Sequence, residues 1–260
     1  MNNTELNTKL PVLDIFLEAI YLPIKHFRVL LKFGSPLIIL SGLFFIYLSI
    51  FSGDNESNEY SSIIKILFNI LTIASILMAV VGCHRTFLMS PEDVNNTRAI
   101  RWTGREMRFL GWWVAIGVIT CIIAIPFAMV EMPIIRNLLE YEAKYKFYFY
   151  LILILVNLPI YYFIARWSLI LPAAAIDKRN LSLFWAWDLS KDNGLRLLVL
   201  IGLIPLLAEL IFNLFIPNSA SLIFTYFINL LWFVISVMEI GLLSLSYAYL
   251  SKAKLTTKED

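Results

Sequence analysis

The stretch Arg166-Trp167-Ser168-Leu169-Ile170-Leu171-Pro172-Ala173-Ala174-Ala175-Ile176-Asp177 joins two long apolar runs of the chain. Because proline lacks an amide hydrogen and clashes with the preceding turn, Pro172 predicts a break or kink at this point. Trp185 and Trp187 follow, and they predict a short helix over 182–192 whose aromatic side chains lie at a membrane interface. Asn193-Gly194 then predicts a left-handed stop before the next apolar run.

Composition places the chain in a membrane. Of its 260 residues, 60% are hydrophobic and only 15% are charged, whereas a soluble domain is about 25% charged. Apolar surface in such excess must face lipid. The two cysteines, Cys83 and Cys121, lie in apolar runs and are expected to be reduced thiols. With only two histidines and no Cys/His cluster, we expect no metal site and no cofactor.

Six apolar runs are long enough to cross ~30 Å of hydrocarbon at about 1.5 Å per residue. They cover approximately residues 33–51, 66–82, 110–130, 147–165, 197–216 and 222–250. The predicted fold is therefore an all-α, polytopic membrane protein, one domain over 1–260 with six transmembrane helices and short interfacial helices. The remaining segments are an N-terminal helix at 10–27, cytoplasmic loops with amphipathic helices at 83–109 and 166–196, and a polar tail at 251–260.

The N-terminal segment 10–27 carries apolar residues at alternating steps of three and four, which predicts one stripe of a helix. These residues are Leu10, Leu13, Leu17, Ile20, Ile24 and Phe27. Asp14, Glu18 and Lys25 make the segment too polar to span a membrane. A helix lying on the membrane surface, kinked near Pro23, and a helix packed on the bundle explain the pattern equally well.

The basic residues indicate an orientation. With both termini inside, the inner segments hold 17 of the 21 Lys and Arg residues, and the outer side holds only Lys65, Arg136, Lys144 and Lys146. This bias predicts cytoplasmic termini by the positive-inside rule. The segment 52–60, which is acidic and polar, is then an outer loop.

Arg98, Arg101, Arg105 and Arg108 are spaced by three, four and three residues, so they would share one face of a helix. We expect this cationic helix to bind the headgroups of anionic phospholipids in the bilayer, each basic side chain contributing ~1 kcal/mol. Plain positive-inside bias, without a specific lipid, is the simpler explanation of the same residues. The patch is short and faces lipid headgroups, so no nucleic acid is expected as a partner. Protein partners are not readable from the sequence.

A second group of polar residues lies at membrane depth: Glu209, Asn213, Glu239, Arg166 and Asn157. An acid at the centre of a bilayer costs at least ~2.5 kcal/mol, so each should face the bundle or a wet cavity. These residues are either structural contacts between helices or part of a transport pathway. Our hypothesis is that Arg166 pairs with Glu239 and that Asp177 holds the inner loop against nearby positive groups.

The sequence contains no nucleophile and base with a recognisable spacing, and no metal or phosphate-loop motif. We therefore assign no catalytic residue and do not expect the chain to be an enzyme. The chain contains a weak internal repeat: the spacing of Arg85-x-x-Leu88-x-x-Pro91 recurs in Arg166-x-x-Leu169-x-x-Pro172. Two parallel helix–loop–helix units would explain the repeat, and chance is the alternative.

The motif formed by Arg166, Ser168, Leu169, Pro172 and Asp177, followed by Trp187-Asp-Leu-Ser-Lys-Asp-Asn-Gly194, resembles a set of six-span bacterial inner-membrane proteins. These are related to the YciC family and to the membrane domain of some glycerophosphoryl diester phosphodiesterases. The run His84-Arg85-x-x-Leu88 is similar to members of the same set, whereas Asp188 departs from its usual pattern. The resemblance, mainly over residues 83–205, implies a six-helix fold in the bacterial inner membrane and no particular activity.

The leading hypothesis is therefore an integral inner-membrane protein without catalytic activity, acting in membrane homeostasis or as a scaffold that binds partners. The alternative is a transporter of small molecules or lipids that uses the polar residues around Glu209.

Overall fold

The structure, a computed structural model, describes residues 9–51, 59–95, 97–139, 146–215 and 222–256. In these ranges the chain folds into helices joined by turns, without a strand. Six helical stretches are long and apolar enough to cross a membrane, which confirms the predicted number. The protein is an all-α polytopic membrane protein.

Five spans are single helices: α2 (Phe27–Phe51), α3 (Glu59–Leu88), α5 (Gly104–Leu139), α6 (Lys146–Trp167) and α11 (Leu222–Thr256). The other span is composite, because α9 (Gly194–Leu197), a π-helical segment (Leu198–Leu203) and α10 (Ile204–Phe215) follow one another directly. Pro205, the second residue of α10, lies two residues after the end of the π-helical segment and has no amide hydrogen to donate to the preceding turn. The spans extend beyond the apolar runs that predicted them, and α11 includes the first residues of the expected polar tail.

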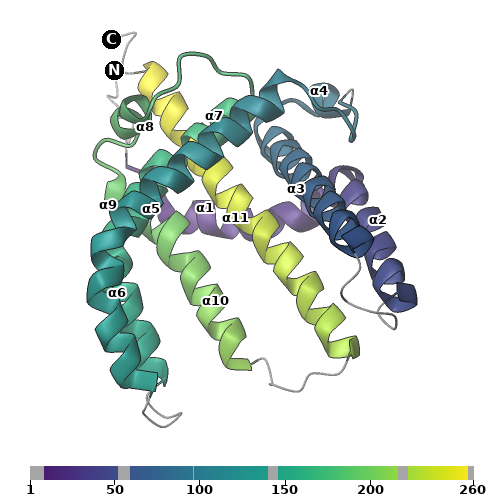
Figure 1. Cartoon of the computed structure of the whole chain (residues 1–260). Helices are drawn as coiled ribbons and strands as arrows, with labels where there is room; N and C mark the ends of the chain where they lie inside the picture. Colours follow the sequence, from purple (N-terminus) through teal and green to yellow (C-terminus); the bar gives the residue numbers. More distant parts are fainter. Residues whose placement is uncertain (1–8, 52–58, 96, 140–145, 216–221, 257–260) are drawn as a thin grey trace.

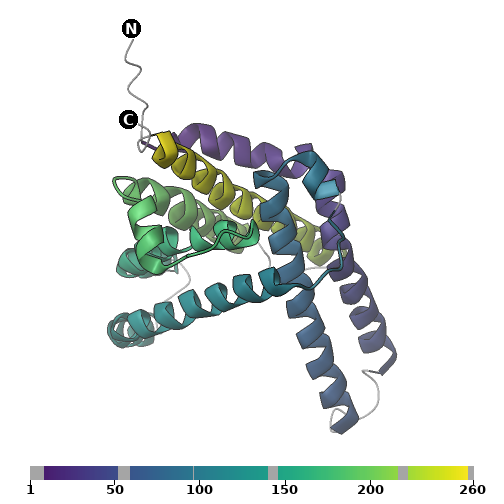
Figure 2. The same ribbon diagram turned by 90° about the horizontal axis from the view of Figure 1, so that it is seen from above.

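The spans come together at the end that carries α7 (Ile170–Ala175) and α8 (Leu183–Leu189), and they spread apart toward the opposite end (Figure 1). At the same end lie α4 (Pro91–Asn95) and the helix α1 (Val12–Lys25), which runs along α11 when the molecule is seen from above (Figure 2). We call this region the inner end, after the side of the membrane on which the positive-inside rule predicts it. The first described residues belong to it as well, since the amide of Leu10 donates to Oδ1 of Asn193 over 2.8 Å.

Helix α1 is packed on the bundle through a different stripe from the one predicted. Ile15, Ala19 and Leu22 are buried against α11, where Gly241 leaves room for the side chain of Leu22. The apolar stripe identified in the sequence is exposed except for Leu10, and its exposed members are Leu13, Leu17, Ile20, Ile24 and Phe27. The helix therefore combines the two alternatives: one face packs on the bundle, and the identified stripe remains free, as in a helix on the membrane surface. One face of α1 is buried by packing on α11, and the other apolar face is exposed and suits contact with lipid.

The stretch that begins at Arg166 forms the centre of the inner end. Helix α6 ends at Trp167, and Ser168 and Leu169 form a turn. Pro172 lies in the first turn of α7, where proline is tolerated, so the chain breaks before the proline and not at it. Ala173, Ala174 and Ala175 are at most 1% exposed, and these small side chains let α7 pack closely against α3, α5 and α11.

The following loop differs from its prediction in one detail. Helix α8 forms within the expected range, and the hydroxyl of Ser182 accepts a hydrogen bond from the amide of Trp185 at its N-terminus. The left-handed residue after it is Asp192, with φ of 64°, and not Asn193 or Gly194. Gly194 is required for another reason: a Cβ atom there would lie 2.8 Å from Cε2 of Tyr162.

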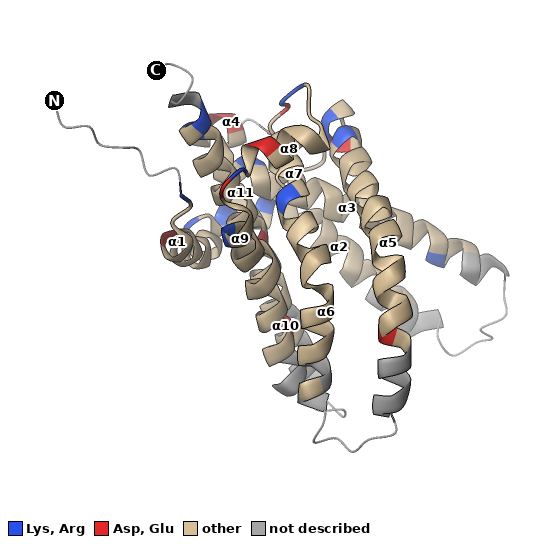
Figure 3. Cartoon of the chain, turned by 90° about the vertical axis from the view of Figure 1, so that its left-hand side faces the viewer, with Lys and Arg blue, Asp and Glu red and all other residues tan. Residues whose placement is uncertain are grey.

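Basic side chains collect at the inner end. Figure 3 shows the Lys and Arg residues of the described chain mostly near this end, where α1, α7, α8 and the end of α11 meet. The long middle sections of the spans are nearly free of charge in the same view, apart from isolated acidic residues. The charge pattern of the sequence is thus gathered into one layer by the fold.

Candidate functional site

The N-terminus of α5 decides where the arginines of the first inner loop lie. Glu106 accepts a hydrogen bond of 2.7 Å from the amide of Thr103 and one from the Thr103 hydroxyl, a capping box that starts the helix at Gly104. Arg98 and Arg101 precede this start and lie in irregular chain, whereas Arg105 and Arg108 belong to the first turns of α5. The predicted cationic helix over Arg98–Arg108 is therefore wrong, because the capping signal Thr103-x-x-Glu106 outweighs the arginine spacing.

Asp177 has a left-handed backbone conformation, which is uncommon for a residue other than glycine. The amide of Lys178 donates to the carbonyl of Ala173 over 3.0 Å, and the amide of Asp177 donates to Ala174 over 3.1 Å. These two bonds form a Schellman motif that closes α7, and Asp177 occupies the left-handed position with φ of 65°. Glycine is the usual residue there, and an aspartate costs conformational energy. Unlike glycine, Asp177 brings a carboxylate to the end of α7.

That carboxylate meets three arginines from two spans. Arg105 lies 3.4 Å from Asp177 and Arg85 lies 3.8 Å from it, while Arg108 forms a third, shorter ion pair. Arg85 comes from α3 and the other two come from α5. Asp177 thus joins α7 to both spans, as the sequence predicted when it assigned this residue to hold the inner loop.

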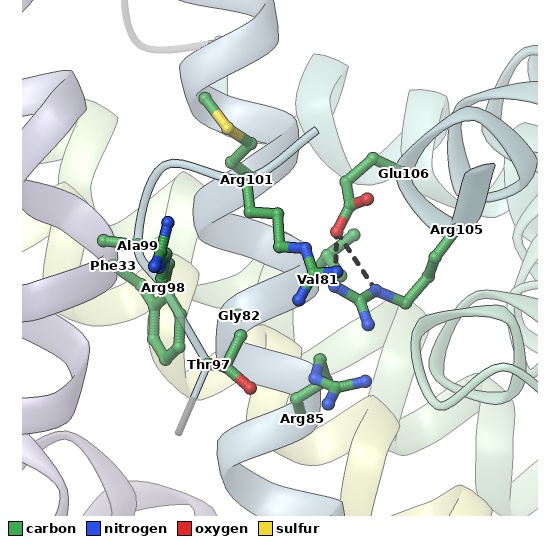
Figure 4. A pocket seen from close by; sticks show the side chains of 11 residues that line it. Phe33, Val81, Gly82, Arg85, Thr97, Arg98, Ala99, Arg101, Arg105 and Glu106 are labelled. Atoms are coloured by element: carbon green, nitrogen blue, oxygen red, sulfur yellow. Dashed lines mark hydrogen bonds and ion pairs between the residues drawn. The ribbon is translucent and has the colours of Figure 1, made fainter. Parts of the chain in front are cut away.

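Beside this cluster is a depression that we call the arginine pocket, lined by Arg85, Arg98, Arg101 and Arg105 together with Glu106 and Phe33. It encloses about 230 Å³, including the space that opens to solvent at its mouth. Figure 4 shows the guanidinium groups of Arg85, Arg101 and Arg105 turned toward the same space, with Arg98 beside Phe33. On the wall of α3, a Cβ on Gly82 would lie 2.5 Å from Cγ of Phe33, so glycine allows α2 and α3 to meet.

Arg85 is the buried member of this group. Its side chain is 10% exposed, and Nη1 donates to the carbonyl of Ala175 over 3.5 Å. Nε is buried and has no hydrogen-bond partner among the described residues. An unsatisfied buried donor typically costs about 1–3 kcal/mol, and more when it is charged. A partner for this nitrogen would therefore be strongly favoured.

Arg98 and Arg101 form the open side of the pocket. Both are exposed, and their side chains make no hydrogen bond or ion pair within the part of the chain that the structure describes. Between and after them, Ile100 is 72% exposed and Trp102 is 43% exposed. Cationic and apolar side chains therefore alternate on one exposed loop, a composition that suits the boundary between headgroups and hydrocarbon.

A second cavity at the inner end is lined by Arg108, Trp112, Lys178 and Arg179 among others. The ammonium group of Lys178 lies over the ring of Trp185, 4.8 Å from its centroid, and this interaction stabilises the cation. Burial lowers the pKa of Lys178, and the nearby charge of Lys254 lowers it further. Phe184, expected as an interfacial anchor, is 87% exposed on α8.

Arg166 does not pair with Glu239. Its Nε donates to the Ser190 hydroxyl over 2.7 Å, Nη1 to the Tyr162 hydroxyl over 3.0 Å, and Nη2 to the carbonyl of Trp187 over 2.6 Å. The guanidinium carbon also lies 3.4 Å from the centroid of a Trp187 ring. This buried cation is stabilised by neutral acceptors and an aromatic face, and within the described residues it forms no ion pair. The predicted pair was wrong because α8 folds back onto Arg166: Trp187 of α8 and Ser190 directly after it accept from the guanidinium, and Tyr162 of α6 accepts as well.

The polar residues at membrane depth are not joined into one hydrogen-bonded group within the described residues, although the charge of Glu209 acts on Glu239 and on Tyr161. Asn157 donates to the carboxylate of Glu131 on α5, a partner that the prediction did not name, and to the carbonyl of Leu153 over 2.9 Å. Glu209 is exposed on α10 and Glu239 is half-buried on α11. The side chain of Asn213 lies outside the described residues. Glu131 was missed because it falls near the predicted end of its apolar run.

His84 is a buried residue that joins three helices. It is 2% exposed, and Nδ1 lies 2.7 Å from the Ser244 hydroxyl on α11. Its ring also packs against Phe109 of α5. His84 therefore joins α3, α5 and α11 immediately beside Arg85 and does not reach lipid. Cys83 is buried and reduced.

Together these observations define a helical membrane protein whose inner end carries a partly buried group of arginines. No family model matches the chain, and neither a curated protein nor a solved structure matches it.

Proposed function

We propose that this protein is a non-catalytic scaffold of the bacterial inner membrane, with both termini cytoplasmic, that is bound to anionic phospholipids of the inner leaflet. The observation that carries the proposal is the loop of Arg98 and Arg101, two exposed arginines without a partner in the described chain, next to exposed Ile100 and Trp102. An anionic lipid can bind both kinds of side chain, because its headgroup pairs with the arginines and its acyl chains contact the apolar side chains. Kinship with the YciC family stays part of this proposal and rests on the motif around Arg166.

A role in transport has less support. The two cavities described above lie at the inner end, and Glu209 lines neither of them. Glu209 is exposed on α10, and within the described residues no hydrogen bond joins it to Asn157. Asn157 is already engaged with Glu131. We therefore prefer a scaffold, whose polar residues hold helices together, over a protein that moves a substrate past them.

Lipid retention tests the proposal. Protein purified in a neutral detergent is analysed for bound phospholipid by mass spectrometry. The double variant Arg98→Gln/Arg101→Gln should retain at least about tenfold less anionic lipid, since each basic side chain near a charged surface contributes ~1 kcal/mol. The matched control Arg28→Gln/Arg179→Gln removes the same charge from two other exposed arginines and should retain lipid like the parent. Equal lipid content in all three proteins would refute the proposed role.

Orientation is tested separately. In a variant without Cys83 and Cys121, single cysteines at Ser57 and Glu142, which lie outside the described residues, should react with an impermeant thiol reagent added to intact cells. A cysteine at Asn95, in α4 of the inner end, should react only after the membrane is opened. Labelling of Asn95→Cys from outside would reverse the proposed topology.

A further inference from the structure

We propose that the arginine pocket is a discrete site for one phosphate group, in which the buried Nε–H of Arg85 donates to a phosphate oxygen. The inference rests on the proposed binding of anionic lipid and adds to it a defined stoichiometry and a buried donor. The phosphate is that of a lipid headgroup or a free phosphate ion, and the two sources are distinguished below.

The charge of the pocket calls for an anion. Four arginines line it, and Arg108 lies beside them; together they face the two carboxylates of Glu106 and Asp177, which leaves an excess of three positive charges. Glu106 is also committed elsewhere, because it accepts hydrogen bonds from Thr103 at the start of α5 and from Arg105 over 2.7 Å. Arg85 and Arg105 are 10% and 12% exposed, so water screens their repulsion only in part. An anion at this point would reduce that repulsion.

The available donors match the geometry of a phosphate. Arg85 uses Nη1 for the carbonyl of Ala175 and leaves its buried Nε without a partner among the described residues. Asp177 does not supply that partner, since its contact with Arg85 is to Nη1 at 3.8 Å. Arg98 and Arg101 bring two further guanidinium groups, free in the described chain, to the mouth of the same pocket. Planar guanidinium groups bind phosphate oxygens through paired, charge-assisted hydrogen bonds.

The size and lining of the pocket limit the ligand. The space inside the pocket, away from its open mouth, is only about the size of one water molecule. It therefore admits one phosphate oxygen, and the rest of the phosphate would lie at the mouth. Phe33, Met78 and Val81 form an apolar wall from α2 and α3. Such a wall favours a lipid phosphate, whose glycerol and acyl chains continue from the phosphate into the membrane.

The test measures binding of short-chain phosphatidylglycerol to the full chain in neutral detergent, by native mass spectrometry and titration. The wild-type protein should retain one such lipid per chain. Arg101→Gln, which changes an exposed side chain, should weaken binding about fivefold or more, and Arg85→Lys, which keeps the charge but lacks Nε, about tenfold. The control Arg179→Gln should bind like the parent. Thermal unfolding of each variant identifies the proteins that are folded.

The outcomes separate the two levels of the proposal. If Arg98→Gln/Arg101→Gln loses lipid while Arg85→Lys binds normally, or if bound lipid shows no preferred number per chain, the discrete site is refuted and only surface attraction remains. If none of these variants loses lipid, the proposed function fails too. If Arg85→Lys does not fold, Arg101→Gln and the stoichiometry of the wild-type protein decide. Inorganic phosphate that competes at millimolar concentration indicates a free ion as the ligand, and no competition indicates the lipid headgroup.

Discussion

Replacing Asp177 by asparagine isolates the charge that joins three helices. Asparagine has nearly the same shape and also tolerates the left-handed backbone with φ of 65°. The substitution therefore removes the ion pairs to Arg85, Arg105 and Arg108 and leaves the Schellman motif intact. What remains is a group of arginines without their shared carboxylate.

The expected loss follows from burial. Asp177 is 48% exposed, but Arg85 and Arg105 are only 10% and 12% exposed. Exposed ion pairs contribute about 0–1 kcal/mol, and breaking a buried one costs about 3–5 kcal/mol, so an intermediate value of about 2 kcal/mol is expected. At roughly 2–4 °C per kcal/mol for a chain of this size, the midpoint of thermal unfolding should fall by about 4–8 °C.

The assay is thermal unfolding in neutral detergent at a fixed scan rate, because membrane proteins often unfold irreversibly. The matched control is Asp188→Asn, which removes another carboxylate of the inner end. Asp188 pairs with Lys254, and both of these side chains are more exposed than those of Arg85 and Arg105. Its midpoint should fall by less than about 2 °C. Equal shifts for Asp177→Asn and Asp188→Asn would show that the three-arginine cluster does not hold the inner end together.

Three further predictions concern the packing of the same region. Gly194→Ala should lower stability by about 1–3 kcal/mol, because the added Cβ displaces the Tyr162 ring whose hydroxyl accepts from Arg166. A double-mutant cycle of Arg166→Gln with Glu239→Gln should give a coupling energy near zero, since the two residues do not touch. Partial burial, and then the charge of Lys25, lowers the pKa of His26. The contribution of neutral His26 to stability is therefore complete above pH 6.5 and is lost as the pH falls below that value. Unfolding midpoints at about pH 7.5 and about pH 5.5 measure this loss.

Each of these has a matched comparison. Gly111→Ala adds a methyl group in open space on α5 and should leave stability unchanged or raise it by up to about 1 kcal/mol, so a similar loss at both glycines would contradict the contact with Tyr162. For Arg166, a cycle with Ser190→Ala should give a clear coupling energy, and its absence would contradict the observed hydrogen bond. His26→Gln should flatten the pH dependence, and an unchanged slope would assign it to another group.

Local signals in the sequence were sufficient for several features. Pro172 predicted a break in the chain, and the two tryptophans predicted a short helix over 182–192. The chain turns just before Pro172, and α8 lies within the predicted range. The Thr103-x-x-Glu106 signal was equally local but was not used, and it would have moved the predicted start of α5 to its observed place. The arginine spacing suggested a longer helix only because a helical period says nothing about where a helix begins.

The sequence by itself determined that this protein crosses the membrane six times and that its basic residues belong to one side. Both properties depend on hydropathy and charge, which sum over neighbouring residues and need no knowledge of contacts. The tertiary structure alone decided which groups meet: Arg166 binds Ser190 and Trp187 and not Glu239, and Arg85 reaches Asp177 from 92 residues away. Such partners are set by how distant helices pack, because a buried arginine can donate to a hydroxyl, a carbonyl or a carboxylate, or lie over an aromatic face. The sequence therefore predicts that a partner is needed, while the fold selects it.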